Sequence, residues 1–86
     1  MAWKITWTDE ALSELANLDT PAARRVVAKL EGAAADPIRS FSRLKGSYLW
    51  RLRIGDYRMV AKLHQESATI EIRKVGHRST VYDRRS

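Results

Sequence analysis

Three arginines in the second half of the chain have the spacing most suggestive of chemistry. Residues 48–54 alternate in polarity, which predicts a strand, and residues 57–64 read as a second strand. Gly55-Asp56 between them predicts a two-residue hairpin turn with Gly at its first central position. In that register Arg53 lies directly opposite Arg58, and Arg51 lies on the same face.

Like charges placed opposite one another destabilise a sheet, so this pair calls for a reason. An anion bound between the two arginines reverses the sign of that interaction, because planar guanidinium groups bind phosphate oxygens well. Lys62 falls on the same predicted face and adds to the positive charge. The alternative is two solvated arginines splayed apart and neutralised by a nearby acid such as Glu71. The sequence therefore favours an anion-binding face centred on Arg53 and Arg58.

The segment after the last predicted strand adds further polar groups. Gly76 is expected to end that strand and to turn the chain back, which would bring Arg78 toward the sheet. Tyr82 is a residue type that stacks on a base or donates a proton, or one that simply closes the edge of a small core. His77 is a candidate acid or base by type, whereas His64 reads as a surface residue.

Composition excludes several classes of protein. The 86 residues suffice for one domain, expected to span 1–86, and the absence of Cys with only two His excludes disulfides and a structural zinc site. Residues 1–42 carry five Lys or Arg against six Asp or Glu, whereas residues 43–86 carry eleven against four. This asymmetry favours a polyanionic partner. No apolar run is long enough for a membrane span, and no signal pattern is present, so the cytoplasm is expected.

The elements that must position these residues follow from the same patterns. Residues 2–7 alternate as a strand, with Trp3, Ile5 and Trp7 on one side. Thr8 and Asp19 read as caps of two helices, whose apolar stripes are Leu12, Leu15, Leu18 and then Val26, Val27, Leu30. Residues 38–46 read as a loop, and strands are expected at 48–54, 57–64 and 68–75. The predicted fold is α+β, an N-terminal strand and a helical hairpin followed by an antiparallel three-strand meander, with both helices on one face of a single sheet.

The chain resembles the RelE family of the RelE/ParE toxin superfamily over nearly its whole length. The resemblance is strongest in Leu44-Lys45-Gly46, in the run Tyr48 to Val60 that contains Gly-Asp-Tyr-Arg, and in Val75-Gly76-His77-Arg78 through Val81-Tyr82. It implies a toxin that enters the ribosome and cuts bound mRNA without a metal or other cofactor. It also implies a cognate RelB-like antitoxin and a toxin–antitoxin hetero-oligomer.

The resemblance also assigns roles to individual residues. Those matching the family's catalytic positions are Arg51, Arg53, Arg58, Arg78 and Tyr82. The other residues expected to contact RNA are Lys45, Lys62, Arg73, Lys74 and His77. Positions 51 and 53 often carry lysine in ribosome-dependent members, and arginine essentially never loses its proton. The general base is therefore left open between His77, Tyr82 and a 2′-hydroxyl activated by the positive cluster.

Two other functions compete with RNA cleavage. The first is inhibition of gyrase in the manner of ParE toxins, which share the superfamily fold. The second is a basic nucleic-acid-binding domain without toxicity. The cluster of arginines near a terminal tyrosine favours the ribonuclease, because a gyrase inhibitor has no need of a phosphate-binding cluster beside a phenol.

Overall fold

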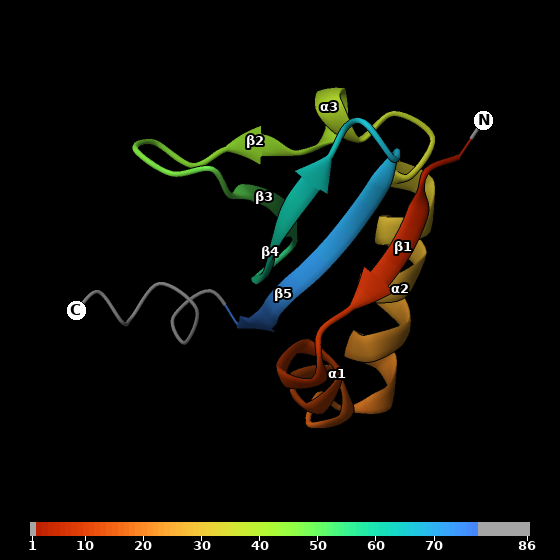
Figure 1. The fold of residues 1–86 in the computed structure, drawn as a ribbon. Coiled ribbons are helices and arrows are strands. Elements are labelled where there is room, and N and C mark those ends of the chain that lie inside the picture. The colour runs from red at the N-terminus through yellow and green to blue at the C-terminus, as the bar shows by residue number, and fades with distance from the viewer. Residues whose placement is uncertain (1, 78–86) are drawn as a thin grey trace.

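The computed structural model describes residues 2–77, which form a mixed five-stranded sheet with helices packed on one face (Figure 1). The chain order of its elements is β1 (Lys4–Trp7), α1 (Asp9–Ala16), α2 (Thr20–Ala33), α3 (Pro37–Ser40), β2 (Ser42–Arg43), β3 (Trp50–Ile54), β4 (Tyr57–His64) and β5 (Thr69–His77). The strands lie in the order β1-β5-β4-β3-β2. The predicted α+β class, with one sheet and a helical hairpin on one of its faces, is confirmed.

The β3–β4 hairpin has the predicted register. Ile54 pairs with Tyr57, and Arg53 pairs with Arg58. The turn is tight because Gly55 adopts a φ of +59°, a value that costs a residue with a Cβ atom roughly 1–2 kcal/mol. The two-residue turn thus fixes which side chains share a face along the whole hairpin.

Both long helices begin at the predicted caps. The Thr8 hydroxyl accepts a hydrogen bond from Ala11 N at 3.1 Å, and the Asp19 carboxylate accepts one from Ala22 N at 2.9 Å. The predicted apolar stripe of α1 is wrong at Leu12, which is 48% exposed, whereas Ala11 is fully buried. The helix is too short to bury both, and the small Ala11 allows it to lie close to the sheet.

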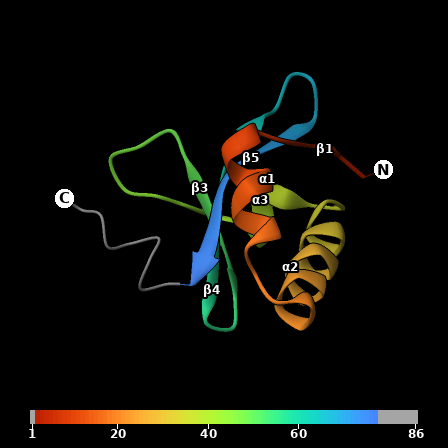
Figure 2. The ribbon, with the colours of Figure 1, turned by 90° about the horizontal axis from the view of Figure 1, so that it is seen from below.

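The core lies between the helices and the sheet face turned toward them (Figure 2). Its buried members come from α1, α2, the segment around Phe41 and alternate positions of β3, β4 and β5, and the predicted core residues of the hairpin are all in or against it: Trp50, Leu52, Ile54, Tyr57 and Met59. The opposite sheet face has no helix on it among residues 2–77. In that part of the chain no helix is long and apolar enough to cross a membrane.

Two details differ from the sequence-based expectation, and a third, the partner of β1, was left open by the sequence. The predicted loop 38–46 contains the single turn α3 and the two-residue strand β2, which pairs with the start of β3. β1 pairs in parallel with β5, the strand farthest from it in sequence among the described strands. Gly76 does not end the last strand: it pairs directly opposite Arg58, and the strand continues to His77. Glycine inside a strand is typical where another group approaches closely, and here the Arg58 side chain is buried beside it.

A candidate anion-binding face

Five basic residues project from the sheet face that the helices leave uncovered. We call this set the cationic face; its members are Arg51, Arg53, Arg58, Lys62 and Arg73. The first four were predicted to share this face, and the alternation of buried core residues on β3 and β4 confirms it. Arg73 joins them because it follows the buried Ile72 on β5, and it is the extra residue of a bulge opposite Val60 and Ala61.

Arg58 is the fixed member of the cationic face. It is only 5% exposed, and its Nη1 donates hydrogen bonds to the carbonyl oxygens of Gly55 at 2.9 Å and Tyr57 at 3.0 Å. The alternative of two solvated arginines splayed apart is therefore wrong for Arg58. The guanidinium instead braces the hairpin turn and places a buried positive charge beneath the surface.

Arg53 and Arg51 supply charge that solvent reaches. Arg53 is exposed directly across from Arg58, and Arg51 is half-buried two residues earlier on β3. The surface therefore combines one buried and two accessible guanidinium groups within a single hairpin. Such an arrangement favours a phosphate, because the two accessible guanidinium groups can donate hydrogen bonds to its oxygens while the buried one adds positive charge.

Glu71 interrupts the positive charge at the far end of the face. Its carboxylate lies 2.8 Å from His64 Nε2 and 3.6 Å from Arg73 Nε. The hydrogen bond with His64, helped by the charges of Arg73 and Lys62, lowers the pKa of Glu71 below its usual value of 4.5. The positive charge of Arg73 is thus partly balanced by Glu71, whereas Arg51 and Arg53 lie farther along the face on β3.

Lys74 pairs with Val60 on the same side of the sheet, but its ammonium group lies against α1. Its Nζ lies 2.8 Å from Glu10 and 3.7 Å from Glu14, both on α1. The hydrogen bond and charge of Lys74 lower the pKa of Glu10. These ion pairs join α1 to β5, and the contact of Lys74 with RNA stays a prediction.

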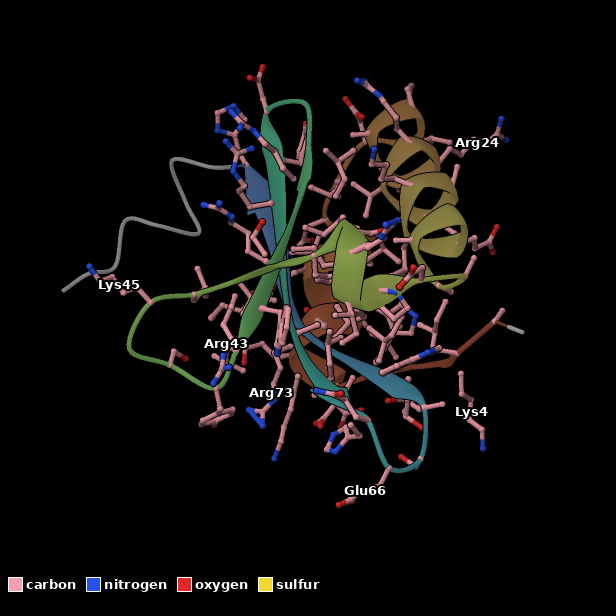
Figure 3. All side chains as sticks on the ribbon, turned by 90° about the horizontal axis from the view of Figure 1, so that it is seen from above. Lys4, Arg24, Arg43, Lys45, Glu66 and Arg73 are labelled. Carbon is pink, nitrogen blue, oxygen red and sulfur yellow. The ribbon has the colours of Figure 1, made fainter. Side chains whose placement is uncertain are left out.

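His77 and Lys45 lie at the margins of the site. His77 is exposed at the end of β5 and meets the Tyr57 ring edge-on, with centroids 5.7 Å apart. Lys45 lies in the segment between β2 and β3, which extends away from the helices. In Figure 3 Lys45, Arg43 and Arg73 lie on one side of the molecule, and Arg24 extends from α2 on the other. Arg78 and Tyr82, two predicted catalytic residues, lie outside the described residues.

Comparison with known proteins identifies the family to which the chain belongs. The family model for the ParE toxin of the type II toxin–antitoxin system parDE matches residues 5–82. The chain belongs to this family, within the RelE/ParE superfamily. The toxin domain is therefore the α+β domain described above. None of the curated proteins compared with the toxin matches it.

Solved structures share the toxin's fold. The RelBE2 toxin–antitoxin complex of Mycobacterium tuberculosis matches with a TM-score of 0.85 at 24% identity, covering 92% of this chain and 94% of that one. The RelBE complex of Escherichia coli gives 0.76 at 24% identity, with 88% and 96% covered. The RelE–RelB complex of Pyrococcus horikoshii gives 0.76 at 22%, with 91% and 97% covered.

The strand predicted over residues 48–54 begins later in the structure. Tyr48 precedes β3 and is 57% exposed. Its ring lies beside Lys62, with Nζ 5.2 Å from the ring centroid. Gly46 two residues earlier gives the only sequence signal, because it indicates a turn rather than a continuing strand.

Proposed function

We propose that this toxin is an endoribonuclease that cuts mRNA on the ribosome and so inhibits translation in the cytoplasm. The observation that carries the proposal is the pairing of exposed Arg53 with buried, hydrogen-bonded Arg58 on an uncovered sheet face. Two guanidinium groups held opposite each other suit a phosphodiester better than they suit the sheet itself.

The reaction we propose needs no metal, because the arginines supply the positive charge. The ribose 2′-oxygen loses its proton and attacks the adjacent phosphorus, and the bond to the 5′-oxygen breaks. The leaving 5′-oxygen takes a proton from water, so the products are a 2′,3′-cyclic phosphate and a 5′-hydroxyl. Arg51 and Arg53 stabilise the charge that develops on the phosphate oxygens. The buried charge of Arg58 makes the electrostatic potential at the site more positive. Arg78 and Tyr82 are proposed to complete the site, with Tyr82 holding a base.

The proton from the 2′-hydroxyl requires an acceptor. Arginine is not suited to this step because its guanidinium group stays protonated. His77, exposed at the end of β5, and Tyr82 are the candidate bases. The third route is loss of the proton to solvent from a hydroxyl whose pKa the arginines lower.

We also propose a RelB-like antitoxin as partner in a hetero-oligomer. Three of the similar structures are complexes of a RelE toxin with its RelB antitoxin, from a mycobacterium, an enterobacterium and an archaeon. An antitoxin that inhibits the proposed reaction must bring acidic or apolar groups over the cationic face.

Gyrase inhibition is the second candidate, favoured by the match to the ParE family model. It requires a surface for a protein or a protein–DNA complex rather than a site for one phosphate. The burial of Arg58 is compatible with this function too, since a bracing arginine serves any use of the hairpin.

One induction experiment separates the two functions. The toxin is induced in cells, the 5′ ends of a translated reporter are mapped, and gyrase-linked DNA breaks are measured in parallel. Cuts within codons that disappear in Arg53→Ala and persist in Arg24→Ala support the ribonuclease. The same loss is expected for Arg58→Ala and Arg78→Ala. Intact message with accumulating gyrase–DNA breaks rejects RNA cleavage in favour of gyrase inhibition, and normal growth points to a non-toxic binding domain.

A further inference from the structure

Tyr48 is an exposed aromatic residue on an ordered turn. Its side chain keeps 57% of its surface in solvent, more than any other large apolar residue among residues 2–77. The turn is held by hydrogen bonds from Leu44 N to Leu49 O at 2.9 Å, from Ser47 N to Leu44 O at 3.1 Å, and from Leu49 N to the Ser47 hydroxyl at 3.0 Å. Gly46 enables the turn with a φ of +73°. The ring is therefore presented to solvent by a defined backbone.

Basic side chains surround this ring. The turn forms a shallow concave surface lined by Arg43, Lys45 and Tyr48. Lys62 Nζ lies over one face of the Tyr48 ring, 5.2 Å from its centroid, and links the turn to the cationic face, so a base would stack on the other face of the ring. Arg43 is itself held over the Trp50 ring at 5.7 Å. Among residues 2–77, no acidic residue lines this surface.

An aromatic ring among cations suits a nucleic acid better than an apolar protein segment. Every base offers a π-face to the ring, and the adjoining phosphates meet the lysines and arginine. A protein partner that buried the ring would have to pair or desolvate three basic side chains at once.

We infer that Tyr48 is a stacking platform for a base of single-stranded RNA, with Lys45 and Lys62 holding the neighbouring phosphates. This inference rests on the proposed ribonuclease function and adds a subsite to it. Lys62 follows Arg58 by four strand residues, a separation of roughly 13 Å. The stacked base therefore lies to one side of the phosphate at Arg53, not at the scissile position itself.

Binding of a non-cleavable RNA tests the inference. The full chain is titrated with a labelled 2′-O-methyl single-stranded oligonucleotide, and affinity is read from fluorescence anisotropy. Tyr48→Ala is expected to weaken binding about 5- to 100-fold, as loss of one stacked base predicts, and Tyr48→Trp to retain it. Leu12→Ala is the matched control, since it truncates an exposed apolar side chain on α1.

The outcomes distinguish this inference from the proposed function. Unchanged affinity in Tyr48→Ala, with weaker binding in Arg53→Ala, overturns the platform and leaves the ribonuclease standing. Unchanged RNA affinity together with weaker antitoxin binding in Tyr48→Ala also overturns it, and assigns the ring to a protein interface. Absence of RNA binding by the parent chain, with gyrase-linked breaks in cells, overturns both.

Discussion

The two arginines that face each other across the hairpin differ in burial, and substitution separates their contributions. Arg58→Ala removes two hydrogen bonds from a charged donor and is expected to lower the free energy of unfolding by about 1.5–3 kcal/mol. Arg53→Ala removes a repulsive neighbour and is expected to change it by less than about 1 kcal/mol, in the stabilising direction. Urea denaturation of both variants measures the difference.

This contrast matters for reading activity assays. Loss of RNA cleavage in Arg53→Ala reports on the site, whereas loss in Arg58→Ala also reports on the turn that the guanidinium braces. Equal destabilisation by the two substitutions would contradict the structural role assigned to Arg58.

A second residue, Glu71, links stability to pH. Because its folded-state pKa is lowered, its carboxylate contributes stability above the usual value of 4.5, and this contribution is lost as the pH falls through the lowered value. Glu71→Gln is therefore expected to be less stable than the parent at pH 7 and to match it in strong acid. Thermal unfolding across this pH range measures the effect, with Glu66→Gln in the exposed turn as control. A difference that persists unchanged in acid would show that the carboxylate charge is not responsible.

At the scale of elements, α1 pairs with a backbone amide at the edge of β5 that β1 does not reach. β1 pairs with β5 only as far as Ile72, and beyond it the Glu14 carboxylate accepts a hydrogen bond from Val75 N at 2.9 Å. Glu14→Ala leaves this amide without its acceptor and is expected to destabilise the toxin by about 1–3 kcal/mol. Glu14→Gln keeps an acceptor and should restore most of that loss.

Amide hydrogen exchange at Val75 gives the direct measurement. Exchange is expected to accelerate in Glu14→Ala and to remain slow in Lys74→Ala, which removes the exposed ion pairs but not the hydrogen bond. Slow exchange in all three variants would show that α1 does not protect this edge.

The β4–β5 turn contains a residue in a costly conformation. Ala68 has a φ of 50°, in the left-handed region that favours glycine. Ala68→Gly removes roughly 1–2 kcal/mol of strain and adds a smaller entropy cost in the unfolded chain, so a net gain of up to about 1 kcal/mol is expected. Urea denaturation measures it, and a destabilised variant would show that the turn carries no such strain.

Local signals accounted for the hairpin and the helix caps. Gly55-Asp56 determined the register of β3 and β4, because a two-residue turn leaves one pairing available. Thr8 and Asp19 satisfy amide groups within their own first turns, so their role is readable without tertiary information.

The features that the sequence did not reveal depend on distant contacts. The burial of Arg58 and the continuation of β5 through Gly76 require knowledge of both strands at once. Likewise, Ala11 rather than Leu12 is buried because of how α1 meets the sheet. The ion pairs of Lys74 were also not predicted, because its partners Glu10 and Glu14 lie sixty or more residues away in the chain.

At the scale of the whole molecule, the uneven charge predicts binding that depends on salt. The net charge of +6 arises in the half of the chain that holds the cationic face. Affinity for single-stranded RNA is expected to fall as salt rises, with a log–log slope of about −0.7 for each phosphate contacted. Arg53→Ala should make this slope shallower by about 0.7, and Arg24→Ala, on the far side of α2, should leave it unchanged. Equal slopes for all three proteins would show that Arg53 contacts no phosphate.

The position of β5 in the sheet has a consequence for how the domain is assembled. It is the last of the described strands to be synthesised, yet it lies between β1 and β4 and pairs with both. Until it is present, β1 has no partner, and its half-buried Trp3, Ile5 and Trp7 have no completed core to join. Such long-range pairing slows folding, because loop closure comes before any compensating contact. The toxin therefore acquires its structure only once nearly all of the described chain has been made.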